Sequence, residues 1–128
     1  MITFEDFKKI ELRAGKILSA EKIPATDKLL KLSVDFGEMG EVAEPEGTGT
    51  GNKSMLFLRP RQIVSGISTY FPDPQTLVGK TCMFCTNLEP RMIKGFESNG
   101  MIVAVSDAEG NFSLLEPNSS IKPGTLAK

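Results

Sequence analysis

The sequence has no histidine among its 128 residues. This absence excludes Ser-His-Asp and Cys-His catalysis, together with every zinc site that needs a histidine ligand. A catalyst built from this chain would depend on carboxylates, lysine, tyrosine or cysteine, and no paired-carboxylate motif is present to support such chemistry. The sequence therefore favours a binding protein over an enzyme, and we expect no metal site and no cofactor.

Long hydrophobic runs are also missing, since no stretch approaches the roughly 18 apolar residues that a membrane-spanning helix needs. The first residues, Met1–Asp6, lack the basic start and apolar run of a signal peptide. Only two cysteines occur, which suits a reducing compartment when no export signal is evident. We therefore expect a cytoplasmic protein without membrane contact.

The sequence also lacks an excess of positive charge, since its net charge is −1. A protein that coats nucleic acid indiscriminately should be strongly basic. The charge is uneven, however: residues 38–58 contain four glutamates and one lysine, and the remaining residues hold 14 basic and 12 acidic side chains. Any nucleic-acid site must therefore be a local patch, with modest and salt-sensitive binding.

The hydrophobic pattern predicts mostly strands, with short helices in two places. Thr3 is an N-cap for a helix over Phe4–Lys9, and Asp73 begins a second short helix that stops at Gly79. Residues 38–54 show no periodicity, so we interpret them as a long mobile loop, and the short apolar run at residues 55–58 is a candidate extension of the next strand. Residues 38–58 together are interpreted as an inserted loop. Strands are predicted over residues 12–23, 30–36, 62–67, 81–86, 101–105 and 112–115.

The order of these elements predicts the fold. A short helix between the third and fourth strands is typical of the OB-fold, a five-stranded, partly open Greek-key barrel. Residues 30–36 alternate strictly between apolar and polar, whereas residues 12–23 change phase at Gly15, which indicates a bulge or sharp bend there. We predict an all-β fold in one domain, residues 1–128, with a short N-terminal helix and a C-terminal extension.

Two local motifs suggest other chemistry but lack its context. Cys82 and Cys85 form a lone C-x-x-C within a predicted strand, where they would lie on opposite faces roughly 10 Å apart; that spacing suits neither a disulfide nor a shared metal, so we interpret both as core residues. Residues 47–54 nearly match a phosphate-binding loop, but Asn52 replaces its second glycine and no long helix follows. We interpret them as a loop tip.

Three blocks of residues also recur at a characteristic order and spacing. The first contains residues 4–17 and 25–35, the second residues 61–67 and 77–80, and the third residues 87–91, Gly95, Ser98 and residues 100–102. Together they resemble the tRNA-binding OB domain found at the C-terminus of bacterial methionyl-tRNA synthetases and in stand-alone relatives. The blocks cover nearly the whole chain except residues 38–58.

The resemblance implies a non-catalytic module that binds tRNA by shape rather than by base sequence, either alone or in support of a methionyl-tRNA synthetase. It also implies a homodimer, for which Phe4, Phe7 and Ile10 of the N-terminal helix are the candidate interface residues; packing within the chain is the alternative for them. One similar relative is described as a chaperone for protein export. A dimeric peptide-binding chaperone on the same scaffold is therefore the alternative function.

The family's RNA-facing motif maps onto Asn87, Arg91, Ser98 and Met101, with Lys94 nearby. Arg91 and Lys94 would contact phosphates, Asn87 and Ser98 would hydrogen-bond a backbone oxygen, a base edge or a 2′-hydroxyl, and Met101 would offer apolar surface to a splayed base. Each residue has a simpler alternative: the cations as solvated loop charges, Asn87 as a backbone-turn residue and Met101 as core.

The sequence departs from the family pattern at two places. Residues 38–58 appear as an insertion, and their acidity would screen RNA or form a separate contact. Glu89 occupies a position where relatives often have lysine, which weakens the local positive charge. Both departures bear on the affinity for RNA more than on the fold.

Overall fold

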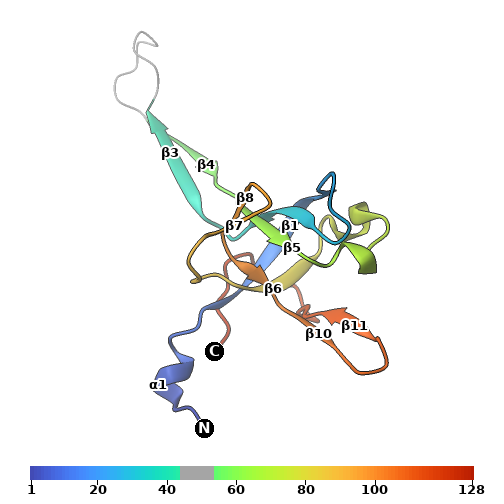
Figure 1. Ribbon diagram of the computed structural model, residues 1–128. Coiled ribbons are helices and arrows are strands. Elements are labelled where there is room, and N and C mark those ends of the chain that lie inside the picture. Colours follow the sequence, from blue (N-terminus) through green and yellow to red (C-terminus); the bar gives the residue numbers. More distant parts are fainter. Residues whose placement is uncertain (44–53) are drawn as a thin grey trace.

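The computed structural model describes residues 1–43 and 54–128 (Figure 1). One short α-helix and two 3₁₀ helices accompany the strands of that part of the chain. The elements are α1 (Phe4–Phe7), β1 (Leu12–Lys22), β2 (Leu30–Asp35), β3 (Met39–Ala43), β4 (Ser54–Leu58), β5 (Arg61–Ser65), η1 (Ser68–Tyr70), η2 (Pro74–Leu77), β6 (Thr81–Cys85), β7 (Arg91–Ile93), β8 (Phe96–Ser98), β9 (Met101–Ile102), β10 (Ala104–Ser106) and β11 (Phe112–Leu114).

Five strands form one antiparallel sheet in the order β5-β2-β1-β6-β9. The long strand β1 is shared by both halves, because residues 12–16 pair with β6 and residues 16–22 pair with β2. The sheet curls until its outer strands approach each other, and the backbone N–H of Asn99, just before β9, donates to the Gln62 carbonyl of β5 at 2.8 Å. With η2 between β5 and β6, this is the predicted OB barrel.

The core fills the inside of this barrel. The alternation predicted for β2 is confirmed, since Leu30, Leu32, Val34 and the following Phe36 are all buried. Phe84 of β6 is fully buried and meets the Phe36 ring edge to face, with ring centroids 5.2 Å apart. Such edge contacts between aromatic rings add to the stabilisation gained from burying their area.

The predicted bulge in β1 is present, but not at Gly15. Gly15 pairs in register with Cys82, and the register shift against β2 falls between Ile17 and Ser19. Gly15 serves packing instead: a Cβ there would lie 2.5 Å from Cε1 of the Phe36 ring. A change of hydrophobic phase located the irregular strand correctly but not the residue that bulges.

The two short helices begin where the sequence predicted. At α1, the Thr3 side chain accepts from the Asp6 backbone N–H and the Asp6 carboxylate accepts from the Thr3 N–H, which completes a capping box. This helix ends at Phe7, two residues earlier than expected. At η2, the Asp73 carboxylate accepts from the Gln75 N–H.

The interpretation of residues 38–54 as an irregular loop is wrong for Met39–Ala43, and residues 55–58 belong to a strand of their own, β4, rather than to an extension of β5. β3 and β4 pair there as an antiparallel hairpin, from Met39 opposite Leu58 to Ala43 opposite Ser54. This hairpin projects from the barrel in Figure 1. Neither strand has a hydrophobic alternation, because exposed residues such as Leu56 and Phe57 occupy positions on both faces, and the apolar run at residues 55–58 was the sequence signal for β4. The loop-tip interpretation, residues 47–53, lies outside the described residues.

Both cysteines are buried and free, as the sequence predicted for core residues. Burial raises the pKa of the Cys82 thiol to about 11, so the reactive thiolate is scarce near neutral pH. We expect neither cysteine to react with iodoacetamide in the native protein at about pH 8, and both to react in denaturant, as measured by intact mass. Rapid modification of Cys82 without denaturant would contradict this packing.

No helix in the described ranges, residues 1–43 and 54–128, combines the length and the apolar character needed to cross a membrane.

Candidate nucleic-acid interface

OB barrels bind their ligands on the face of the second and third strands, between the loop that joins strands 1 and 2 and the loop that joins strands 4 and 5. Here that face consists of β2 and β5. The two loops are residues 23–29 and residues 86–100. The second loop contains the third sequence block except for Met101 and Ile102, which form β9 directly after it, so the motif predicted to face RNA lies beside the face that OB barrels use for ligands.

Residues 86–100 are ordered by the small hairpin β7–β8, which the sequence analysis missed. Lys94 and Gly95 form its turn with φ values of 51° and 86°, the left-handed conformation that a tight two-residue hairpin requires at both positions. Strands of three residues are too short for a hydrophobic period to appear. Gly95, a residue that adopts positive φ without steric cost, was the available sequence signal.

The hairpin is fixed to the barrel through β5. The Val64 backbone N–H donates to the Ser98 hydroxyl at 3.0 Å, and the Gln62 side-chain amide donates to the Glu97 carbonyl at 3.1 Å. These bonds hold β8 along β5. The side chains of the hairpin are therefore presented by a supported element.

Arg91, Ser98 and Met101 line one hollow of about 480 Å³, which we name the Arg91 hollow. Part of its rim is apolar and accessible, because Met101 is 51% exposed and Leu88 is 45% exposed. Arg91 is exposed and has no ion-pair partner among the described residues. A cation next to flexible apolar surface suits a phosphate and its attached base.

Lys94, in the turn of the hairpin, lines a different hollow from Arg91, so the predicted set is divided. It lines a second hollow together with Pro24 and Ala25 of the β1–β2 loop and Phe96 of β8. Lys31 of β2 places its ammonium 5.0 Å from the centroid of the Phe96 ring. The hairpin thus brings the two loops of the ligand face together, and its partly buried Phe96 lines the same hollow as Lys94 and lies close to Lys31.

Asn87 and Ser98 use their polar groups within the chain. The Asn87 side-chain oxygen accepts from the Glu11 N–H at 2.9 Å, and its amide donates to the Lys9 carbonyl at 2.6 Å. The buried Ser98 hydroxyl accepts from Val64 and donates to the Gly100 carbonyl at 3.1 Å. These bonds favour positioning roles for both residues, and their direct contact with RNA stays a prediction.

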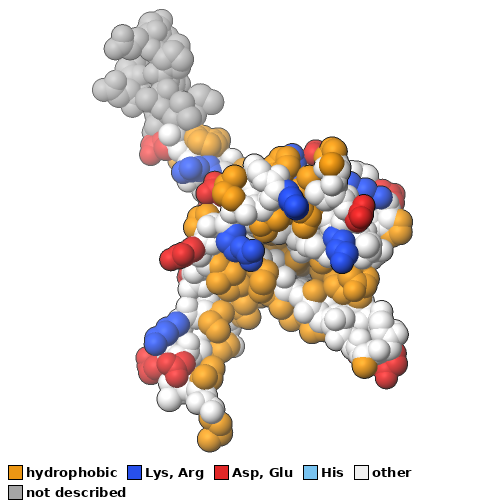
Figure 2. Space-filling model, in the orientation of Figure 1, with side chains coloured by type: hydrophobic (Ala, Val, Ile, Leu, Met, Phe, Trp, Pro, Cys, Tyr) orange, Lys and Arg blue, Asp and Glu red, His pale blue; other side chains and the backbone are white. Residues whose placement is uncertain are grey.

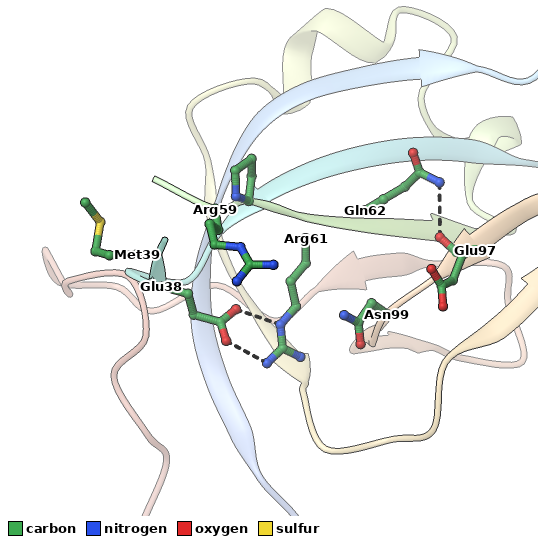
Figure 3. Close-up of a pocket in the computed structure, with 8 residues that line it drawn as sticks. Glu38, Met39, Arg59, Arg61, Gln62, Glu97 and Asn99 are labelled. Atoms are coloured by element: carbon green, nitrogen blue, oxygen red, sulfur yellow. Dashed lines mark hydrogen bonds and ion pairs between the residues drawn. The ribbon is translucent and has the colours of Figure 1, made fainter. Parts of the chain in front are cut away.

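Figure 3 shows a third recess that residue-type reasoning did not identify, between the base of the β3–β4 hairpin and β8. We name it the Arg61 groove; its volume is about 550 Å³. Arg61 belongs to the second sequence block, but its partner Glu38 lies 23 residues earlier in the acidic segment. The residues that line the groove are Glu38, Met39, Arg59, Pro60, Arg61, Gln62, Glu97 and Asn99.

Arg61 is held on several sides. Its Nε and one terminal nitrogen donate to the two oxygens of Glu38 at 2.7 and 3.0 Å, and the other donates to the Thr86 carbonyl at 2.7 Å. The guanidinium lies 5.4 Å from the centroid of the Phe36 ring. This fork lowers the pKa of the Glu38 carboxyl and raises the pKa of Arg61, so both groups stay charged.

The charge of the ligand face is therefore moderate and dispersed. Figure 2 shows separate Lys and Arg side chains with hydrophobic surface between them. Glu38 is paired with Arg61, and Glu21 lies 3.6 Å from Lys31. Glu89 lines the Arg91 hollow together with Arg91, but neither Arg91 nor Lys94 forms an ion pair among the described residues, which leaves both available to an external anion.

The candidate dimer residues lie away from this face. Helix α1 extends from the barrel in Figure 1, and Phe4, Phe7 and Ile10 are 69%, 37% and 48% exposed. The helix contributes no buried residue to the core. Exposed apolar side chains on so short a helix are compatible with a second copy, and the dimer stays a prediction.

A family model described as "Putative tRNA binding domain" matches residues 50–126 of the chain. Among curated proteins, the methionine–tRNA ligase of Methanoregula boonei is 46% identical over 125 residues, which cover 98% of this chain and 15% of that protein. The ligase of Porphyromonas gingivalis is 39% identical over 127 residues, covering 99% and 16%. The chain spans about 15% of the length of the curated relatives it matches.

Two solved structures show the same architecture. A MetRS-related protein from Pyrococcus horikoshii has a TM-score of 0.76 at 30% identity, with coverage of 100% of this chain and 98% of that one. The chaperone CsaA from Bacillus anthracis has a TM-score of 0.72 at 25% identity, covering 100% and 99%.

Proposed function

Because the chain belongs to the tRNA-binding domain family, we propose that it binds tRNA through the β7–β8 hairpin and the adjoining face of β2 and β5. The observation that supports this most is the hairpin itself: it presents Arg91 and Lys94 without carboxylate partners among the described residues, and it is fixed to β5 by hydrogen bonds. Cations held in place on an OB ligand face suit the phosphates of a folded RNA.

The contacts proposed are mainly with the RNA backbone. Arg91 and Lys94 line two different hollows of the hairpin, so we propose that they contact two different phosphates of the same ligand. Phosphate contacts position a nucleic acid without reading its sequence. We therefore propose recognition of tRNA shape, with tolerance of different tRNA sequences.

The family is one of binding modules, and the ligases that match are far longer than this chain. We propose that the chain is non-catalytic and supports a methionyl-tRNA synthetase, in the same polypeptide or as a separate partner, in the cytoplasm. We further propose that residues 1–128 act as one domain and that two copies associate through Phe4, Phe7 and Ile10, which are exposed in the single chain.

The test is a tRNA titration at about 50 mM and about 200 mM salt, followed by electrophoretic shift or fluorescence anisotropy. With three or four phosphate contacts, we expect the affinity to fall roughly thirtyfold between the two conditions. An unfolded protein is added as competitor in a parallel series. The competitor series is needed because the chaperone CsaA has a similar structure. If the chain binds the unfolded protein at high salt and shifts no tRNA at low salt, peptide binding replaces tRNA binding as the proposed function.

A further inference from the structure

The Arg61 groove carries a set of groups that the proposed backbone contacts do not use. It lies beside β8, on the side of Glu97 and Asn99, whereas Arg91 lines the separate Arg91 hollow. Its lining is mostly polar side chains, with Arg59 and Arg61 as its cations. A recess of about 550 Å³ is large enough for one nucleotide, and a polar lining offers specific hydrogen bonds rather than general apolar contact.

Arg61 provides a flat, fixed surface at this groove. Its guanidinium is packed against the Phe36 ring and anchored by Glu38 and by the Thr86 carbonyl. Anchoring removes much of the conformational entropy that an arginine would otherwise lose on binding. Guanidinium planes are surfaces on which unpaired RNA bases stack.

Glu97 and Asn99 supply hydrogen-bonding groups next to this surface. They are two residues apart at the end of an extended strand, so their side chains leave the backbone on the same side. Figure 3 shows both pointing into the groove. Their backbone is set by Gln62, which donates to the Glu97 carbonyl and accepts from the Asn99 N–H at 2.8 Å. Neither side chain has a hydrogen-bond partner among the described residues.

We propose that the Arg61 groove binds a single unpaired guanine of the RNA, read by Glu97 and Asn99. The Glu97 carboxylate accepts the adjacent N1–H and N2–H donors of the guanine edge, the Asn99 amide donates to O6, and the ring stacks on Arg61. This inference rests on the proposed RNA binding. It adds base specificity to an interface that otherwise contacts phosphates.

Guanine fits because of where its donors lie. A carboxylate has two oxygens that only accept, so it needs two adjacent N–H groups. On the Watson–Crick edge, adenine and cytosine each have one amino donor next to a ring nitrogen that is an acceptor. Uracil has one N–H donor between two carbonyl acceptors. Only guanine offers the pair. Inosine has the same ring with N1–H but without the N2 amino group, and is therefore a one-bond probe.

The experiment measures dissociation constants of the full chain for five pentanucleotides, UUGUU, UUIUU, UUAUU, UUCUU and UUUUU, where I is inosine, alongside tRNA. We expect guanine to be preferred about tenfold over adenine, cytosine and uracil, and roughly threefold over inosine. Glu97→Gln should reduce the guanine preference to within about twofold of the other bases while UUUUU binds as tightly as to the native protein or more tightly.

Glu89→Gln is the matched control, because it removes the same charge from the Arg91 hollow rather than from the groove. It should leave the ratio of guanine to adenine affinity unchanged even if every affinity rises. Equal binding of all five oligonucleotides, with tRNA still bound, would overturn the guanine inference and leave the proposed function intact. A guanine preference that survives Glu97→Gln would also overturn it. Failure to bind tRNA and every oligonucleotide would remove both.

Discussion

The double variant Arg91→Gln and Lys94→Asn should bind tRNA roughly thirtyfold more weakly than the native chain, about 2 kcal/mol at about 1 kcal/mol for each phosphate contact. The same loss should appear with different tRNAs, because phosphates carry no sequence. The slope of log affinity against log salt should become shallower by roughly 1.5, since two fewer phosphates are neutralised. Asparagine is chosen at position 94 because it tolerates the positive φ found there.

The matched control is Lys122→Gln with Lys128→Gln, which removes two exposed charges from the C-terminal segment. It changes the net charge by the same amount and should shift the affinity by less than about threefold, as expected of charges not at the interface. If control and test variants weaken binding equally, the effect belongs to overall charge and the hairpin is not the interface.

Replacing Phe84 with alanine should lower the free energy of unfolding by about 3–5 kcal/mol, measured by urea titration. Phe84 is fully buried and supports Phe36, whose ring in turn supports the Arg61 guanidinium. The large cost comes from lost transfer energy together with the cavity that the barrel cannot close. A loss of this size is a large part of the total free energy of unfolding of a typical domain, about 5–15 kcal/mol.

Phe57→Ala is the comparison for this stability measurement. Phe57 lies on β4 outside the barrel and is 42% exposed, so its truncation should cost less than about 1 kcal/mol. An equal decrease in the free energy of unfolding for Phe84→Ala and Phe57→Ala would contradict the conclusion that the barrel core is the main source of stability. The comparison also separates the barrel from the projecting hairpin.

Elements with a strong local signal were predictable from the sequence. The alternation of residues 30–36 identified β2 and its buried face, and the polar caps at Thr3 and Asp73 identified the starts of α1 and η2. Each of these signals is produced by residues within a few positions of one another. Local chemistry alone therefore sufficed for them.

The parts that were missed depend on distant partners or very short elements. The Glu38–Arg61 fork joins residues from an acidic segment and a strand, and residue type gave no reason to pair them. The interpretation of the acidic segment as a screen overlooked that Glu38 anchors a cation. Arg91 was placed on an accessible surface by its motif, but whether Asn87 and Ser98 faced solvent depended on contacts with Glu11 and Val64.

Asn87 links the start of residues 86–100 to the N-terminal arm through its bonds to Lys9 and Glu11. The direction in which α1 leaves the barrel is thus tied to the strand end from which the proposed RNA contacts begin. Two copies joined through α1 would hold their ligand faces at a set separation. One large RNA touching both faces would gain avidity from that spacing, because the second contact forms at a high effective concentration. Loss of the Asn87 amide would then weaken the binding of RNA, because the two ligand faces of the dimer would no longer be held at a fixed separation, even though every cation is still present.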